Sequence, residues 1–483
     1  MFLFHFPKDS ERKWSVNYIW LTLIIILFSQ VGCKKLVQIS DPTNTITTNE
    51  TFNDSIDAAS AIMGVYSKLV NTRKLLYIAN GGATVYCGLS SDELINFASS
   101  SDITQFYTNT LNSNNTFINA YFWIPAYSCI YQANACIEGL SASKGINQNT
   151  KDQFIGEAKF IRAFLYFYLT NLFGDVPYIT STDFNHTSGA TRTPQSQIYQ
   201  AIINDLKDAQ NSLPADYSYS GGARTRANAM AATALLARVY LYQKQWSDAE
   251  TQASKIIGNS NTFNLTMDLN QIFQLNSSET ILQWQLNTAY DPYNATTEGV
   301  NLITRNANSA PYCYLSPQLL NAFETGDQRK AAWMKSTKFA GKTYYYPYKY
   351  KIGPTQKSAN ADPTEYYMIL RLAEQYLIRA EARAHLNRFS DARADIDSIR
   401  LRAGLSNTTA PDDADSVLAA VAQERKIELF AEWGHRWLDL KRTGQADATL
   451  KQIKPGWAAY QQLYPIPQSE LVNDPRLSQN SGY

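Results

Sequence analysis

The chain has 483 residues, of which 45% are hydrophobic, so it can bury a large core and is not a disordered protein. Its 43 basic and 42 acidic residues leave a formal net charge of +1, which excludes a global field that would recruit nucleic acid, and no nucleic-acid partner is expected. Tyrosine outnumbers phenylalanine, 31 to 21, and its amphipathic ring suits half-wet contact surfaces.

The amino terminus predicts an export signal. Three basic residues precede the run "YIWLTLIIILFSQVGC", whose apolar core is shorter than the roughly 20 residues that span a bilayer as a helix. We therefore expect a signal peptide over 1–32. The run ends in Val31-Gly32-Cys33, which resembles the cleavage box of bacterial lipoproteins, with Cys33 as the lipidated residue. Cleavage at another position and an uncleaved anchor are the alternatives.

A polar, Thr- and Asn-rich segment over 33–54 reads as a lipidated tether. After it, apolar residues recur at i, i+3 and i+4 in many segments, among them "GEAKFIRAFLYFYLTNLFGD" and "RLAEQYLIRAEARAHLNRF", which is the period of an amphipathic helix. The pattern predicts helical regions over 55–257 and 371–483.

Four cysteines remain besides Cys33: Cys87, Cys129, Cys136 and Cys313. Two of them lie seven residues apart in a predicted helix, about 10 Å along its axis, which is too far for a disulfide. None has the spacing of a metal site. We expect these residues to be small, buried side chains.

Two segments resemble tetratricopeptide helix pairs. "ARVYLYQKQWSDAE" and "AEARAHLNRFSDAR" both run from a helix rich in small residues, through an aromatic residue, to Ser-Asp-Ala at the start of a second helix. Trp246 and Phe389 are expected to fill the turns, and Ser247 and Ser390 to cap the second helices. The pairs lie far apart in the sequence, which predicts an all-α-dominated scaffold with long irregular loops and a few short strands.

The segment over 258–370 differs from the helical regions in its periodicity and composition. "ETILQWQLN" and "KTYYYPYKYKIG" alternate apolar and polar residues, which predicts short strands and a buried Trp284. Long loops rich in Asn, Tyr, Gly and Pro surround them. Loops of this length in a compact domain are usually functional or disordered, and their tyrosine content favours function.

The motif "ERKIELFAEWGHRWLDLKRTG" contains Glu432-x-x-His435, a spacing used by di-metal carboxylate sites. On one continuous helix, five polar side chains would share a face: Glu424, Glu428, Glu432, His435 and Asp439. A second Glu-x-x-His is missing from the chain, so no metal is expected. We interpret the motif as a structural seam with pairs Arg425–Glu428, Arg436–Glu432 and Arg442–Asp439, beside core residues Leu429, Phe430, Trp433, Trp437 and Leu440.

A carbohydrate site needs aromatic faces for the C–H side of a sugar ring, with amides and carboxylates for its hydroxyls. The residues that offer this mixture are Tyr86, Asp92, Asn96, Tyr290, Tyr293, Tyr312 and Tyr314. Packing beneath a loop is the alternative for each tyrosine. Hydrolysis by a carboxylate pair from Asp92, Glu93, Asp291 and Glu298 is a remote third hypothesis, and no nucleotide or cofactor motif accompanies it.

Six motifs occur along the chain in this order: "GEAKFIRAFLYFYLTNLFGDVPYIT", "LLNAFETGDQR", "YKYKIG", "ILRLAEQYLIRAEA", "ERKIELFAEWGHRWLDLKRTG" and "YPIPQSELVNDPRLSQNSGY". Their sequence and order resemble the SusD/RagB family of Bacteroidetes outer-membrane lipoproteins. The resemblance covers nearly the whole chain, with an N-terminal SusD-like region over 55–257, a loop and strand insertion over 258–370, and a C-terminal SusD/RagB region over 371–483.

The resemblance implies a non-enzymatic, cofactor-free protein anchored by lipid in the outer membrane and facing the cell exterior. It would capture oligosaccharides and deliver them to a SusC-like TonB-dependent transporter. The alternatives are a peptide-binding lid of the RagB type and a tetratricopeptide adaptor whose only ligand is protein.

Overall fold

The computed structural model describes residues 51–70 and 75–483. The predicted signal peptide over 1–32, the lipidation site Cys33 and residues 33–50 of the tether lie outside these ranges. Residues Thr51–Tyr483 form one compact unit, and its first helix begins at Ser55. No helix in the described ranges has both the length and the apolar character needed to cross a membrane.

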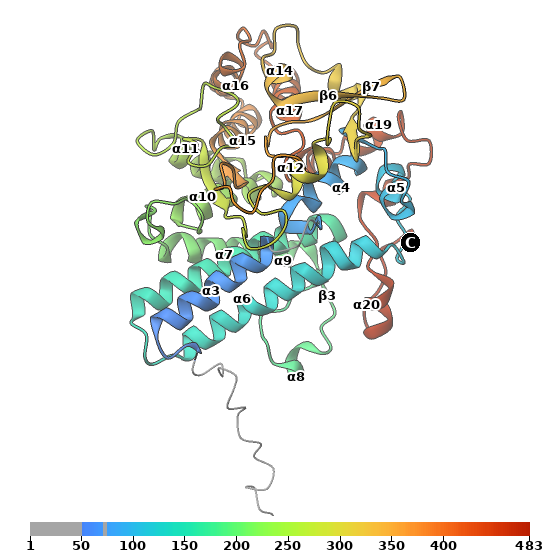
Figure 1. Cartoon of the computed structure of the whole chain (residues 1–483). Coiled ribbons are helices and arrows are strands. Elements are labelled where there is room, and N and C mark those ends of the chain that lie inside the picture. Colours follow the sequence, from blue (N-terminus) through green and yellow to red (C-terminus); the bar gives the residue numbers. More distant parts are fainter. Residues whose placement is uncertain (1–50, 71–74) are drawn as a thin grey trace, which may run out of the picture. The chain divides into compact units, whose positions relative to one another are not determined.

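Helices dominate the described residues (Figure 1). The α-helices are α3 (Ser55–Val70), α4 (Ala83–Ser90), α5 (Ser101–Thr108), α6 (Ile124–Ala142), α7 (Gln148–Phe173), α8 (Phe184–Thr187), α9 (Gln195–Ser212), α10 (Ala229–Tyr242), α11 (Trp246–Ile257), α12 (Thr297–Leu302), α13 (Pro317–Leu320), α14 (Arg329–Trp333), α15 (Leu372–His385), α16 (Phe389–Arg402), α17 (Ala414–Glu428), α18 (His435–Arg442), α19 (Ala446–Leu450) and α20 (Gln468–Asn473). Short π or 3₁₀ turns are η2 (Ile78–Gly82), η3 (Ile118–Trp123), η4 (Ser218–Ser220) and η5 (Ala459–Gln462). The predicted fold class is confirmed.

The strands are short and pair in antiparallel twos. They are β1 (Leu94–Asn96) with β5 (Cys313–Leu315), β2 (Val176–Pro177) with β3 (Arg192–Thr193), β4 (Thr280–Trp284) with β8 (Tyr367–Arg371), and β6 (Met334–Phe339) with β7 (Lys342–Pro347). Strands β4 and β7 lie inside the two segments whose alternation predicted strands, and Trp284 is buried as expected.

The two predicted helix pairs are α10–α11 and α15–α16. Although 258–370 separates them in sequence, α11 packs against α15, so the pairs stack side by side (Figure 1). The prediction of the helix start was wrong by two residues, because each second helix begins at its aromatic residue, Trp246 or Phe389, and the serine expected to cap it lies inside the first turn. Lys244 and Asn387, both with left-handed φ near 60°, make the turns this tight.

Helix α7 runs through the core, where every residue from Phe160 to Phe173 is buried. It packs between α6 and α9, and its Arg162 donates to Asp205 on α9 and Asn134 on α6. Gly174, with φ +76°, ends the helix. The four cysteines expected in the interior are buried and unbridged.

The seam motif is not one continuous helix, which corrects the prediction. Helix α17 ends at Glu428 and α18 begins at His435, and Ala431, Trp433 and Gly434 between them adopt positive φ. Glu432 therefore lies in the connection between the two helices. The five apolar residues expected in the core are all buried.

The break also changes the ion pairs. Arg425 pairs with Asp439 instead of Glu428, and Arg436 pairs with Asp92 instead of Glu432. The predicted pair Arg442–Asp439 is present, with Nε to Oδ1 at 2.7 Å. Since every acid of the seam has a basic partner, the motif is structural.

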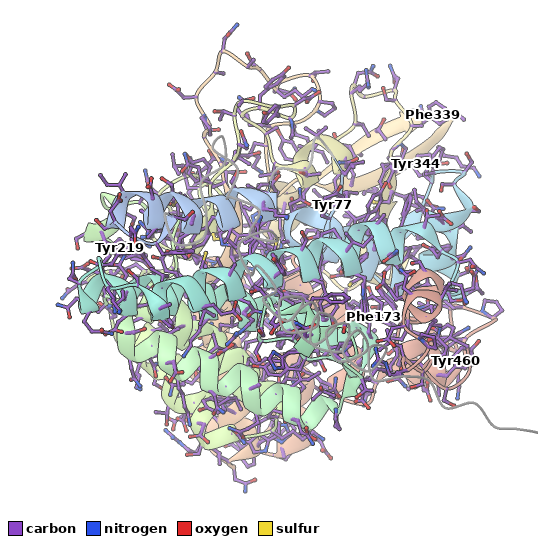
Figure 2. All side chains as sticks on the ribbon, turned by 90° about the horizontal axis from the view of Figure 1, so that it is seen from below. Tyr77, Phe173, Tyr219, Phe339, Tyr344 and Tyr460 are labelled. Atoms are coloured by element: carbon purple, nitrogen blue, oxygen red, sulfur yellow. The ribbon has the colours of Figure 1, made fainter. Side chains whose placement is uncertain are left out.

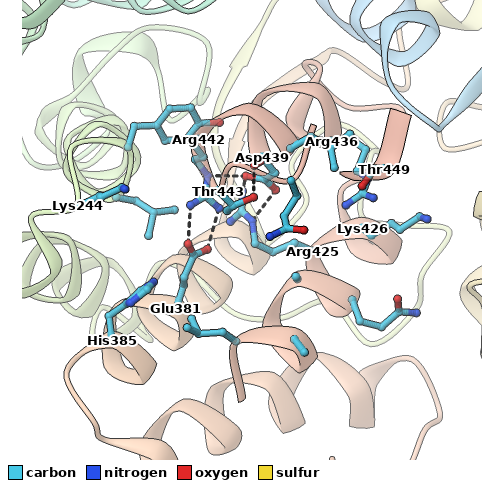
Figure 3. Close-up of a pocket in the computed structure, with 18 of the residues that line it drawn as sticks. Lys244, Glu381, His385, Arg425, Lys426, Arg436, Asp439, Arg442, Thr443 and Thr449 are labelled. Carbon is cyan, nitrogen blue, oxygen red and sulfur yellow. Dashed lines mark hydrogen bonds and ion pairs between the residues drawn. The ribbon is translucent and has the colours of Figure 1, made fainter. Parts of the chain in front are cut away.

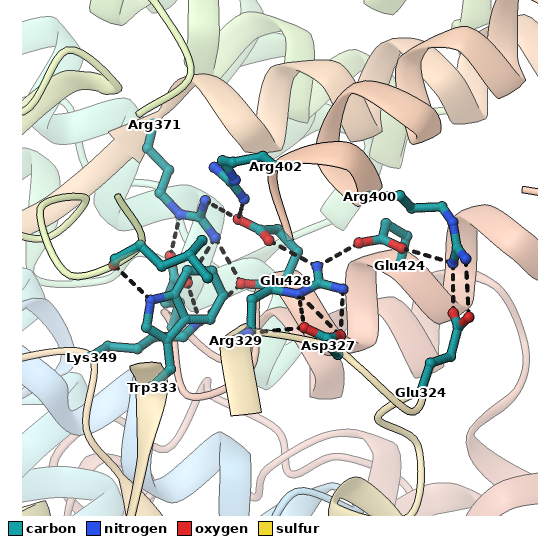
Figure 4. A network of polar contacts seen from close by, with 12 residues as sticks. Glu324, Asp327, Arg329, Trp333, Lys349, Arg371, Arg400, Arg402, Glu424 and Glu428 are labelled. Carbon is teal, nitrogen blue, oxygen red and sulfur yellow. Dashed lines mark hydrogen bonds and ion pairs between the residues drawn. The ribbon is translucent and has the colours of Figure 1, made fainter. Parts of the chain in front are cut away.

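Glu428 lies at the centre of a buried ion network (Figure 4). Its Oε1 accepts from Arg371 and Arg402, each at 2.5 Å, and its Oε2 accepts from Arg329 at 3.0 Å. Burial alone would raise the pKa of this carboxyl, but the three guanidinium groups hold it well below its usual range. Glu428 is therefore ionised at neutral pH.

The network joins segments that are distant in sequence. Glu432 accepts from Lys349, which follows β7, and from Arg371 at the end of β8. Arg402 at the end of α16 donates to Glu279 before β4. The network thus attaches the 258–370 segment to the carboxyl-terminal helices.

We expect Glu428→Gln to lower the free energy of unfolding by about 3–5 kcal/mol, because it leaves buried guanidinium groups with uncompensated charge. The measurement is urea denaturation followed by circular dichroism. Lys451→Met is the control: its pair with Asp447 is about half exposed, and such pairs contribute less than about 1 kcal/mol. Equal effects of the two substitutions would contradict a central role for Glu428.

Candidate functional site

The ladder between β1 and β5 brings together residues that the sequence places about 220 apart. Ile95 is opposite Tyr314, and the backbone N–H of Phe97 donates to the carbonyl of Tyr312 at 3.2 Å. Asn96, Tyr312 and Tyr314 therefore lie at one place, as expected of a shared site. The Asn96 amide donates to Ala98 and Thr104, so this side chain holds the turn that follows β1.

Four aromatic rings meet beside this ladder, and we call them the aromatic platform: Phe97, Tyr314, Phe339 and Tyr344. The Phe97 ring centroid lies 5.3 Å from that of Tyr344, 5.8 Å from that of Phe339 and 6.5 Å from that of Tyr314, and Tyr314 lies 4.9 Å from Tyr344. All four contacts are edge-to-face, the favourable arrangement for aromatic quadrupoles. Phe339 and Tyr344 come from the β6–β7 hairpin (Figure 2), and Phe339 is 36% exposed.

A concave surface with a volume of about 610 Å³ lies next to the platform, and we call it the groove. Its lining residues are Ala98, Val300, Asn301, Ile303, Thr304, Arg305, Ser309, Ala310, Pro311, Tyr312, Pro354 and Lys357. Helix α12 and the loop between it and β5 supply nine of these twelve residues. Hydroxyl, amide and cationic groups line this groove, and no Asp or Glu does.

The loop that carries Tyr290 and Tyr293 approaches the groove through Lys357. The Lys357 ammonium pairs with Asp291 and lies 5.8 Å from the centroid of the Tyr293 ring. Tyr290 is 44% exposed. Four predicted tyrosines and Asn96 thus lie around the platform and groove, and their role in binding stays a prediction.

Tyr86 and Asp92 lie in the interior, which corrects their expected place on an open surface. Every residue of α4 is buried, and the Tyr86 ring packs 4.8 Å from Phe106. Asp92 accepts from Arg436 Nε at 2.6 Å and from Lys426 at 3.0 Å. Burial opposes ionisation of this carboxyl, but the two cations lower its pKa to about 2. Both residues support the site from beneath.

The loop acids considered for hydrolysis are buried or held in ion pairs. Glu93 and Glu298 are buried, and burial raises the pKa of Glu93 to about 8 and that of Glu298 to about 7. Asp291 is occupied by Lys357. Among the described residues, no group of three or more His, Cys, Asp or Glu side chains is positioned to hold a metal ion.

Sequence reasoning missed Phe97, Phe339, Tyr344, Arg305 and Lys357. The alternation in "KTYYYP" indicated a strand but not which face would meet the β1–β5 ladder. For Phe339 the usable signal was Ala340-Gly341, which adopts positive φ at both positions and forms the hairpin turn.

A larger cavity, about 740 Å³, lies among α10, α11, α15, α17 and α18 (Figure 3). The arginines of this cavity have acidic partners: Arg442 donates to Glu381 at 2.8 Å and to Asp439 at 2.7 Å, and Arg425 donates to Asp439 at 2.8 Å. Because these arginines already have acidic partners, we place the candidate site at the platform and groove.

The fold defines the class of the protein as a helical-repeat scaffold, because stacked helix pairs carry long loops that form a groove with aromatic rings beside it. Sequence models narrow the class: the model of the SusD family matches residues 321–483, and one described as "Starch-binding associating with outer membrane" matches residues 48–241. Together they span most of the chain. The chain belongs to the SusD/RagB family.

Named relatives agree with this assignment. SusD-like protein P2 of Formosa agariphila is 26% identical over 517 residues, which cover 96% of this chain and 99% of the relative. Starch-binding protein SusD of Bacteroides thetaiotaomicron is 34% identical over 123 residues, 24% of this chain and 21% of the relative. A solved laminarin-binding SusD-like protein is 25% identical with a TM-score of 0.75, over 89% of this chain and 99% of that one.

Glu298 beneath the groove predicts a pH dependence. Its folded pKa, about 7, exceeds the ordinary 4.5, so the stability it contributes is present below pH 4.5 and is lost as pH rises through 7. Glu298→Gln cannot ionise and keeps a partner in Thr84. Relative to wild type, we expect the variant to gain up to about 3 kcal/mol of stability between pH 5 and pH 8.

Denaturation at both pH values measures this effect. Asp248→Asn, a change at an exposed acid of α11, is the matched control and should leave the pH dependence unchanged. A Glu298→Gln variant that follows the wild-type pH profile would contradict the shifted pKa.

Proposed function

We propose that this protein is a lipid-anchored outer-membrane protein that captures oligosaccharides at the platform and groove and delivers them to a TonB-dependent transporter. The observation that carries the proposal is the aromatic platform, half-buried and exposed at Phe339, beside an open groove with hydroxyl and amide groups. Sugar rings present C–H faces that pack against aromatic faces, and their hydroxyls require hydrogen-bonding neighbours.

Family membership supports the same proposal. One matching family model is described as starch-binding and associated with the outer membrane, one relative is named for starch binding, and one solved structure for laminarin binding. These names describe binding and not catalysis. In this proposal the platform stacks on the sugar, Asn96 orders the β1 turn, and Tyr290, Tyr293, Tyr312 and Tyr314 contribute to the walls.

We expect Tyr344→Ala to weaken oligosaccharide binding about tenfold, because loss of a stacking ring costs on the order of 1 kcal/mol. Tyr345→Ala is the matched control, since side chains alternate along β7 and Tyr345 points to the opposite face. Calorimetric titration over a panel of starch and laminarin oligosaccharides measures both. Equal binding by the two variants and wild type would exclude the platform, and binding of peptides alone would favour the RagB-type alternative.

Delivery to a transporter requires anchoring at the membrane. We expect native Cys33 to keep the protein in the outer-membrane fraction and Cys33→Ser to release it, because only the cysteine thiol can accept the lipid. Affinity purification from detergent-solubilised outer membranes should recover a TonB-dependent barrel. Recovery of a different soluble protein in its place would support the adaptor alternative.

A further inference from the structure

We propose that the groove selects oligosaccharides that carry anionic substituents, either the carboxylates of uronic acids or sulfate esters. This inference rests on the proposed function and names the class of glycan. It is based on the chemistry of the lining residues and not on the global charge, which is close to zero.

The polar side chains that line the groove are donor-rich. Arg305 and Lys357 carry positive charge, and Asn301, Thr304, Ser309 and Tyr312 add amide and hydroxyl groups. A neutral sugar hydroxyl is both donor and acceptor, so carboxylates are useful partners for it. Thr304 and Asn301 already donate to the carbonyls of Asn306 and Thr297. The groove lining has no carboxylate, whereas a ligand with acidic groups would supply acceptors and a counter-charge to the cationic side chains of the lining.

Arg305 is the main determinant in this proposal. It is exposed, and within the described part of the chain it has no hydrogen bond or ion pair. Its planar guanidinium group matches the two oxygens of a carboxylate or sulfate. An unpaired arginine in a concave surface is therefore available to an anionic ligand.

The loop that carries Arg305 is held in place by the β6 strand. Thr337 Oγ1 donates to the Ser309 carbonyl at 2.8 Å, and the Lys338 N–H donates to the Ala307 carbonyl at 2.7 Å. The groove wall is thereby ordered before a ligand arrives, which reduces the entropy cost of binding.

Lys357 is the second positively charged residue that lines the groove. Its partner Asp291 does not line the groove, and with this acid counted the groove keeps an excess of positive charge. The 740 Å³ cavity provides a contrast, since Glu381 and Asp439 neutralise the arginines there. Of the arginines in the described residues that line these two cavities, Arg305 is the one without an acidic partner.

Two matched ligand pairs test the proposal on the whole mature protein by calorimetric titration. They are a sulfated galactan oligosaccharide with its desulfated form, and an oligogalacturonate with its methyl ester; starch and laminarin oligosaccharides complete the panel. We expect the charged member of at least one pair to bind at least tenfold more tightly than its neutral partner. The pair that responds distinguishes sulfate from carboxylate.

Arg305→Gln should reduce this preference five- to tenfold while leaving the neutral ligand unaffected. Lys207→Gln, which removes one exposed charge from α9 outside the groove, is the control. Raising the salt concentration from 50 to 500 mM should weaken binding of the charged ligand only, because exposed charges are screened.

Equal affinity for the charged and neutral members of both pairs would overturn the inference and leave the proposed function standing. The same conclusion would follow if Arg305→Gln weakened the binding of charged and neutral ligands equally. Absence of binding to every glycan in the panel would overturn both. Binding only of neutral starch or laminarin oligosaccharides would also overturn the anionic preference, while supporting carbohydrate capture.

Discussion

The rest of the structure depends on a single buried carboxylate. Glu428 is shared by arginines from β8, α14 and the end of α16, and none of these groups reaches solvent. Each charge is expensive to bury alone, so the group is stable only when complete. This constraint forces three segments into one arrangement, and the helix break after Glu428 follows from the need to aim Glu432 at the same cluster.

The loops that form the candidate site are attached to this cluster at both ends. Glu279, which precedes β4, and Lys349, which follows β7, are bound to Arg402 and Glu432. Between these anchors the chain forms α12, the groove wall and the β6–β7 hairpin. The ion network therefore explains how long, polar loops keep a defined shape on a helical scaffold without a continuous sheet beneath them.

Much of the scaffold could be predicted from the sequence, because long apolar periodicity reports helices and small residues report close helix packing. The pairs α10–α11 and α15–α16 and the buried cysteines are examples. The helix break could not be predicted from Ala431 or Trp433, which rarely adopt positive φ and do so here because tertiary contacts require it. The ion partners were also inaccessible: Asp92 and Arg436 are 344 positions apart.

The candidate site was predicted only in part for a related reason. Tyr312 and Tyr314 were predicted because they stand in a segment rich in tyrosine and asparagine, and both are half-buried at or beside β5. Tyr86 has the same chemistry but belongs to a helix that is buried on all sides, which composition cannot reveal. Phe339 and Tyr344 became relevant only through the pairing of a hairpin with a distant two-stranded ladder.

The four interior cysteines make the folded protein indifferent to the redox state of its surroundings. Burial raises the pKa of each thiol to about 12, so the reactive thiolate is essentially absent at neutral pH. Their side chains serve as packing groups on α4, α6 and β5, and no covalent cross-link contributes to the stability of the described fold. Oxidising and reducing buffers should therefore yield the same native state, and purification needs neither an oxidative refolding step nor protection of these thiols.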